Sequence, residues 1–330
     1  MNEIVIAGSH ASALPHFAGY GLAAILGAAG ARPIRLRWSD AAEPRLSVTS
    51  GFSRVEVGEA VCAHAEGAAA EDSWLNATIE AGSRAGGRLF SPRFKPPGIE
   101  EWGEIVRQRD DFFPSDLLDA CMVVGLGEPS WWRQSEGGSP DAGASRWEMK
   151  TRNKGQEMVA DRLVPLAVEL ANWTPVAVVD GLEGASSSDV VGKESADSRT
   201  ASGFRQPGPT DNALAWCALW GIAATRPVRR VGGMAQTPGV WPRRATHPTV
   251  AALPVWTDDV SLEVVRRVLA SAAFDDAAFA VDPLVRGAAD NRLRTWGVRG
   301  VVTFPILKTG STSAPERQIL SGELRPLESR

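Results

Sequence analysis

The chain has 330 residues and a formal net charge of −4, with 44% hydrophobic and 22% charged residues. This balance excludes a polycation, so contact with nucleic acid has to come from local basic patches or from a basic partner. The three cysteines are far apart in the sequence and form no CxxC pair, so neither a zinc ribbon nor a disulfide framework is supported.

The N-terminal residues lack the features of a targeting segment. Glu3 comes early and no basic stretch precedes the apolar residues, so we expect no signal peptide. The longest apolar stretch, residues 14–31, is interrupted by Pro15, His16 and several glycines, which makes it too broken to span a membrane. We therefore expect a cytoplasmic protein with reduced thiols and no contact with a membrane.

Residues 4–38 form a unit whose pattern returns once in the chain. An apolar β-branched run, a Gly-Ser-His turn and a long apolar helix capped by Ser12 are followed by an Arg-Pro pair and a strand at residues 34–38. Residues 213–231 repeat the helix, the Arg-Pro pair and the strand, with GIAA in place of GLAA. The repeat indicates a packing and binding scaffold rather than a catalytic pocket.

The remaining elements follow from local periodicity and from turn residues. Gly, Pro and Ser clusters predict loops at residues 82–98 and 125–145, the second of them exposed. We expect strands at residues 45–48, 52–57 and 250–256, helices at 60–82, 99–109, 115–124, 146–172, 261–273 and 282–295, and a terminal hairpin formed by 300–307 and 318–327 around Gly310. Ser115–Asp116 is expected to cap its helix, and Pro165 to kink or split the helix that contains it.

The segment at residues 181–209 is rich in Ser, Gly and Asp and has few residues that could anchor a core, so it is predicted to be a flexible linker or a long loop. It is our preferred boundary between an N-terminal α+β domain, residues 1–180, and a C-terminal α+β domain, residues 210–330. The predicted fold class is α+β. We expect an N-terminal mixed or antiparallel sheet with helices, and a mainly helical C-terminal part that ends in a β-hairpin.

Several catalytic signatures are missing from the sequence. There is no GxxxxGK[ST], GxSxG, HExxH or GxGxxG motif, and the four histidines form no ligand pair. Carboxylate doublets occur at Asp110–Asp111, Asp258–Asp259 and Asp275–Asp276, but adjacent side chains point apart, so we interpret them as turns or caps. The sequence therefore predicts no catalytic residue, no metal site and no cofactor.

One alternative concerns the turn at residues 8–12. His10 and His16, with Ser9 and Ser12, lie at the start of the first helix, where backbone amides and the helix dipole favour an anion. The chain could then be an α/β enzyme that binds a phosphorylated small molecule between Gly8 and Ser12. The interpretation that the sequence favours is a helix N-terminus capped by Ser12, with two ordinary surface imidazoles.

Arginine recurs beside tryptophan along the chain. Arginine neutralises phosphates and an indole can stack on an unpaired base, so such pairs suit single-stranded nucleic acid. A core tryptophan with an arginine at its rim gives the same sequence pattern. We expect the second arrangement for Trp38, Trp147, Trp216 and Trp220, which lie on apolar stripes, and leave both open for the loop residues Trp131, Trp132 and Trp241.

Four segments together resemble one protein family. They are the Gly-Ser turn with its GLAAIL helix and RLRW strand, the RNKGQEMVADRLVPLA segment at 152–167, the ALAWCALWGI helix at 213–222 and the RGVVTF strand at 299–304. This combination is similar to large-subunit-type proteins of type I-U (also called I-G) CRISPR systems. The resemblance implies a non-enzymatic subunit of an RNA-guided, Cascade-type surveillance complex in antiviral defence, which contacts guide RNA or target DNA and the other effector subunits.

On this interpretation, arginine- and lysine-rich loops contact the nucleic-acid backbone. The expected contact residues are Arg88, Arg93, Lys95, Arg133, Lys150, Arg152, Lys154, Arg243, Arg244, Trp131 and Trp132. A third possibility is an interaction scaffold that binds partner proteins without nucleic acid.

Overall fold

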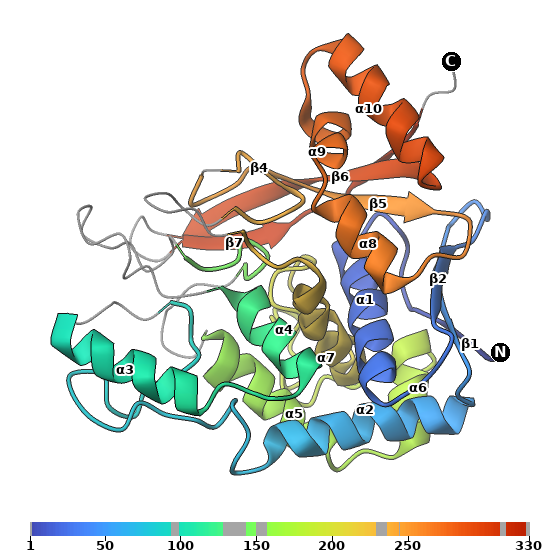
Figure 1. Cartoon of the computed structure of the whole chain (residues 1–330). Helices are drawn as coiled ribbons and strands as arrows, with labels where there is room; N and C mark the ends of the chain where they lie inside the picture. The colour runs from blue at the N-terminus through green and yellow to red at the C-terminus, as the bar shows by residue number, and fades with distance from the viewer. Residues whose placement is uncertain are drawn as a thin grey trace.

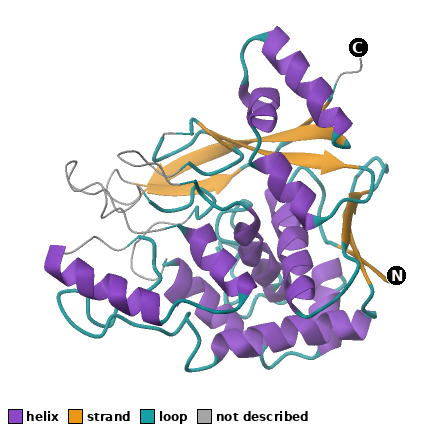
Figure 2. Ribbon diagram, in the orientation of Figure 1, coloured by secondary structure: helices purple, strands orange, loops and turns teal. Residues whose placement is uncertain are grey.

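Two groups of antiparallel strands lie at different edges of a layer of helices (Figures 1 and 2). The computed structural model describes residues 2–93, 99–127, 143–149, 157–228, 236–243, 245–310 and 315–327. The strands are β1 Asn2–Val5, β2 Arg35–Trp38, β3 Leu46–Ser50, β4 Val240–Trp241, β5 Val250–Trp256, β6 Val298–Gly310, β7 Pro315–Ile319 and β8 Glu323–Pro326. The helices are α1 Ala13–Ala28, α2 Arg54–Ala69, α3 Ile99–Asp111, α4 Leu117–Leu126, α5 Val164–Leu170, α6 Pro175–Glu183, α7 Asn212–Trp220, α8 Leu262–Leu269, α9 Ala272–Phe279 and α10 Pro283–Thr295, together with the π-helical turn η2 Val159–Leu163 and the 3-10 turn η3 Gly221–Ala224. The α+β prediction is confirmed.

The N-terminal sheet has the strand order β1-β3-β2, with Ile4 and Leu36 both paired with Val48. The predicted strand at residues 52–57 is wrong, because α2 begins there. Ser53 and Glu56 form a capping box in which Ser53 Oγ accepts from the Glu56 backbone and Glu56 Oε2 accepts from the Ser53 backbone at 2.6 Å. This pair of local bonds stabilises the first turn of a helix where the alternating apolar residues favoured a strand.

The C-terminal sheet has the order β4-β5-β6-β7, and β8 pairs with β6. The predicted terminal hairpin is confirmed, since Ile306 pairs with Ile319 and Gly310 with Pro315. The predicted strand at residues 250–256 is β5. In Figure 1, α9 and α10 lie above this sheet, while α1, α7 and α8 lie below it.

Helix α1 packs against α7 and η3 at the two glycines of the repeated motif, Gly21 in α1 and Gly221 at the start of η3. A Cβ atom at Gly21 would overlap the carbonyl oxygen of Cys217, and one at Gly221 would overlap the carbonyl oxygen of Phe17. Every residue of α7 is buried. The repeat therefore brings its own two copies into contact, and glycine is required at both positions because the backbones approach so closely. The second predicted strand is limited, in the described residues, to a bridge between Val228 and Gln236.

The predicted helix at 146–172 is wrong at its start and split later. Residues 146–149 are non-helical and buried, because Trp147 Nε1 donates to the Pro238 carbonyl at 2.8 Å and the Arg146 backbone donates to Thr237 Oγ1 at 2.9 Å. Further along, η2 leads into α5, which has Pro165 in its first turn.

The segment predicted to be a linker or long loop contains the C-terminal end of α6 and then, from residue 184 to 211, neither helix nor strand. Its side chains are packed. Asp189 is buried and accepts from Thr200 Oγ1 at 2.6 Å and Asn212 Nδ2 at 3.0 Å. Phe204 is stacked on Phe17 of α1. One continuous cluster of buried side chains includes residues from both sides of the segment. The division into two domains stays a prediction.

In the described part of the chain, no helix has both the length and the apolar character that crossing a bilayer requires.

Candidate functional site

Three of the predicted contact residues belong to the part of the chain that the structure describes: Arg88, Arg93 and Arg243. Arg88 and Arg93 line the same hollow, and Arg243 is not part of it. The others lie outside the described residues: Lys95, Arg133, Lys150, Arg152, Lys154, Arg244, Trp131 and Trp132.

A loop at residues 78–91 presents the first of these arginines. Thr78 and Arg88 form an antiparallel bridge. The Ile79 backbone donates to the Gly87 carbonyl and the Gly86 backbone donates to the Ile79 carbonyl, both at 2.9 Å. Gly86 has a φ of +78°, which glycine adopts without strain. The loop borders a hollow of about 650 Å³, which we call the arginine hollow. It is lined by Ser83, Arg84, Arg88, Ser91, Arg93 and Glu157, among others.

Two of the three arginines in this hollow have no carboxylate partner among the described residues. Arg88 donates to the Asn76 carbonyl at 3.0 Å, and the Nε of Arg84 is buried without a hydrogen-bond partner. Glu101 lies near the rim, where it accepts from the Ser83 backbone at 2.6 Å. Arg84 and Arg88 thus form no ion pair with a described carboxylate at a concave surface that Glu157 also lines, and guanidinium groups without an ion pair are suited to bind a phosphate.

Arg93 has a different environment. It is 5% exposed, its Nε is paired with Glu148, and its Nη2 donates to the Glu148 carbonyl at 2.7 Å. Burial raises the pKa of Glu148 to about 7, against the opposing effect of Arg93 and of Arg317. In this structure Arg93 holds residues 91–93 against residues 147–149, and its guanidinium faces a carboxylate rather than solvent.

Arg243 and Trp241 join β4 to α9. Arg243 is paired with Asp275, and the indole of Trp241, 43% exposed, is stacked on Phe279 with ring centroids 5.6 Å apart. The prediction that the stripe tryptophans are core residues is confirmed, since each is at most 1% exposed: Trp38, Trp147, Trp216 and Trp220.

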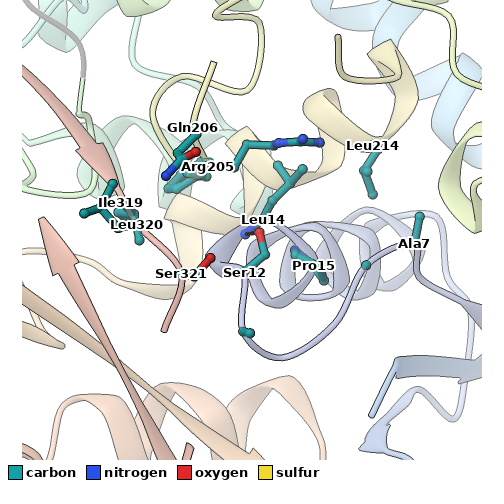
Figure 3. A pocket seen from close by; sticks show the side chains of 13 residues that line it. Ala7, Ser12, Leu14, Pro15, Arg205, Gln206, Leu214, Ile319, Leu320 and Ser321 are labelled. Atoms are coloured by element: carbon teal, nitrogen blue, oxygen red, sulfur yellow. Dashed lines mark hydrogen bonds between the residues drawn. The ribbon is translucent and has the colours of Figure 1, made fainter. Parts of the chain in front are cut away.

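A second cavity, of about 370 Å³, adjoins the turn at residues 8–12 (Figure 3). Ser12 caps α1 as predicted, accepting from the Leu14 backbone at 3.4 Å. This bond uses the Leu14 N–H, and Pro15 has no backbone N–H. Of the first three residues of α1, Ala13 therefore provides the remaining backbone amide. The cation at this cavity is Arg205, which the sequence interpretation missed because it lies in the low-complexity segment.

His16 is not a surface imidazole, so that expectation is wrong. It is fully buried, with its ring 4.4 Å from that of Trp38, and its Nε2 bonds to the His10 carbonyl at 3.0 Å. Burial lowers the pKa of His16 to about 3, so the ring is neutral at physiological pH. A neutral, buried ring contributes no charge to an anion at the turn.

The described residues contain no cluster of three His, Cys, Asp or Glu side chains able to hold a metal ion. Comparison with family models, with curated proteins and with solved structures finds no match to this chain.

Proposed function

We propose that the chain is a non-catalytic, cytoplasmic subunit of a CRISPR RNA-guided effector complex, and that the arginine hollow contacts the nucleic-acid backbone. The observation that carries the nucleic-acid part is the pair Arg84 and Arg88, whose guanidinium groups form no ion pair with any described carboxylate. The CRISPR assignment rests on the resemblance of segments that form α1, α7 and β6.

The loop that carries this pair is suited to a phosphodiester. A Cβ atom built at Gly86 meets no other atom within 4 Å, so a backbone can approach the loop there. Ser91 also lines the hollow, whereas the Ser83 hydroxyl donates to Glu101 at 2.8 Å. Guanidinium groups bind phosphate oxygens by paired N–H donors, and such contacts position a strand without reading its sequence. A subunit with these contacts holds nucleic acid while base pairing to the guide selects the target.

A salt titration tests this proposal. Binding of a labelled single-stranded RNA and of the matching DNA is measured by fluorescence anisotropy for the full chain and for the double variant Arg84→Ala, Arg88→Ala. Each phosphate contact contributes about 0.7 to the slope of log K against log salt, so the double variant should lower the magnitude of the slope by about 1.4. The control is Arg45→Ala, Arg286→Ala, which removes two other arginines that are without an ion pair among the described residues.

An unchanged slope in the Arg84, Arg88 variant would remove these residues from the interface. The CRISPR assignment has its own test, which is purification of the chain with the proteins that its neighbouring genes encode. An RNA of fixed length that copurifies with this assembly supports the assignment, and an assembly free of RNA contradicts it.

The second candidate function is an enzyme that binds a phosphorylated small molecule at the cavity beside residues 8–12. The observation that favours it is the cavity itself, with Arg205 and the Ser12 and Ser321 hydroxyls in its lining. A sugar phosphate that raises the melting temperature of the wild type, but not of Arg205→Ala, would support this candidate.

A further inference from the structure

A third concave surface lies where α1 ends and where α4 and α8 begin, and we call it the three-helix groove. Its volume is about 910 Å³, the largest among the hollows described above. Both α4 and α8 contact α1. The strand β2 and the Arg32–Pro33 pair of the first repeated motif complete the wall.

The floor of this groove is apolar. Leu117, the first residue of α4, is 77% exposed, and it lies beside the buried Leu118 and Cys121. Ala28 and Leu262 contribute apolar surface from the other two helices. A leucine this exposed, at the edge of a concave apolar surface, indicates a place where a protein partner packs.

The rim of the groove carries two guanidinium groups that have no carboxylate partner among the described residues. Arg32 Nη1 donates to the carbonyls of Gly27 at 3.0 Å and Ala31 at 2.6 Å, and Arg35 Nη1 donates to the Ile34 carbonyl at 3.0 Å. These bonds fix the side chains and leave their charge uncompensated.

A third arginine, Arg266, lines the groove and forms an ion pair with Glu263 at 3.8 Å. Burial lowers its pKa, and the charge of Glu263 acts in the opposite direction. The two carboxylates of the groove are engaged. Asp116 caps α4 by accepting from the Leu118 backbone at 2.8 Å, and Glu263 accepts from Arg267 at 3.2 Å. Three arginines and two carboxylates line the groove, so its lining has one positive charge in excess, in a chain whose net charge is negative.

We propose that the three-helix groove binds an acidic amphipathic helix of a partner protein, with its apolar face on Leu117 and Leu118 and its carboxylates on Arg32 and Arg35. An apolar floor with a charged rim is the arrangement by which grooves between helices receive an amphipathic helix. A nucleic-acid strand matches the rim but leaves the exposed leucine unpaired, so the floor favours protein. The inference goes beyond the proposed function, since it needs no nucleic acid and shares no residue with the arginine hollow.

The test uses the full chain and two fluorescent synthetic peptides. One is an amphipathic helix with Leu and Ala on one face and Glu on the other, and the second has Lys in place of every Glu. We expect the acidic peptide to bind and the basic peptide not to bind. The double variant Arg32→Glu, Arg35→Glu should weaken binding of the acidic peptide at least about tenfold and allow the basic peptide to bind.

Matched variants separate the groove from general charge. Arg45→Glu, Arg286→Glu makes the same change of charge at two other arginines and should leave peptide binding unchanged. Ala28→Trp fills the groove from an exposed position, so it should abolish binding while the circular dichroism spectrum stays that of the wild type.

Four results of the peptide experiments would overturn the proposal. They are no binding of the acidic peptide to the wild type, equal binding of both peptides, full retention of binding in the Arg32, Arg35 variant, and displacement of the peptide by RNA. A concentration-dependent dimer of the wild type that the Arg32, Arg35 variant abolishes would show that a second copy of this chain occupies the groove. That result would contradict the acidic partner helix, and none of these outcomes depends on the slope measured for Arg84 and Arg88.

Discussion

The arginines of the C-terminal sheet and those of the loop at residues 78–91 have opposite surroundings. In the sheet, Arg325 of β8 donates to both carboxylate oxygens of Asp290, at 2.6 and 2.9 Å, and to the Ala277 carbonyl at 2.8 Å. In the loop, Arg84 and Arg88 form no ion pair with a described carboxylate. Residue type alone therefore does not distinguish an arginine that stabilises the fold from one that is available to a ligand. The presence or absence of a carboxylate partner distinguishes them.

The difference has an energetic side. Asp290 is 3% exposed, and a buried carboxylate is costly unless a cation and hydrogen bonds compensate it. Arg325 supplies that compensation and joins β8 to α9 and α10. The guanidinium groups of the loop compensate no described carboxylate, and Arg88 bonds only to Asn76, so their removal should affect binding and leave stability almost unchanged. The predictions below test this separation.

The largest expected effect is that of Arg325→Ala. The variant leaves the buried Asp290 without its bidentate partner, so we expect the free energy of unfolding to fall by about 3–5 kcal/mol. Urea denaturation measures this change. Arg325→Lys keeps the charge but not the paired geometry, and should recover part of the loss. A loss below about 1 kcal/mol in Arg325→Ala would show that solvent replaces the pair.

Arg243 tests whether a predicted contact residue is structural. From the sequence, charge reversal at Arg243 and Arg244 is expected to weaken nucleic-acid binding. Arg243→Glu places a second carboxylate against the buried Asp275, so we also expect it to destabilise the fold, by about 2–4 kcal/mol. The exchange Arg243→Asp, Asp275→Arg restores opposite charges and should recover stability.

RNA binding then separates the two roles. If Arg243 contacts phosphate, the exchanged variant folds but still binds RNA more weakly than the wild type. If its binding returns together with its stability, the role of Arg243 is structural. An Arg243→Glu variant as stable as the wild type would contradict the structural role.

Local signals in the sequence predict the ends of helices well. Ser12 caps α1 and Asp116 caps α4, because a short polar side chain bonds to amides two or three residues ahead. The sequence also contains the signal for a helix at residues 52–57, where we predicted a strand, because Ser53 and Glu56 have the spacing of a capping box. Pairing between distant segments was not predictable in the same way.

The candidate sites show this limit. Arg93 and Arg243 belong to basic loops in the sequence, and nothing near them indicates that Glu148 and Asp275 are their partners. Arg88 differs from them only in the three-dimensional neighbourhood of its guanidinium group. Likewise, the three-helix groove at Arg32 is formed by three helices that are far apart in the chain, so the sequence does not predict it. The repeated Arg-Pro motif indicates only that the segment belongs to a packing and binding scaffold.

A smaller effect, which depends on pH, is expected at Glu148. Arg93, Arg317 and Glu157 face this carboxyl, and burial raises its pKa from the ordinary 4.5 to about 7. The folded chain therefore keeps a proton that the unfolded chain has released, so this group's contribution to stability falls as the pH rises from about 4.5 to about 7. The total fall is at most about 3.5 kcal/mol, at 1.4 kcal/mol for each pH unit.

Glu148→Gln mimics the protonated carboxyl and removes this pH dependence. Urea denaturation at pH 5 and at pH 7.5 should show the wild type losing stability relative to the variant between the two values. A constant difference between the two proteins would show that Glu148 stays ionised, as a partner of Arg93, across this range.

The smallest effect on stability is expected for Arg84→Ala, Arg88→Ala. Arg88 loses bonds to Asn76, while Arg84 loses no described hydrogen bond, so the free energy of unfolding should change by no more than about 0.5 kcal/mol. The same variant is expected to change the salt dependence of RNA binding. Normal stability combined with a lower slope would establish that this loop holds arginines for a ligand, in contrast to the sheet. A loss of stability near that of Arg325→Ala would instead mean that the arginine hollow is part of the fold, and the contrast between the two regions would fail.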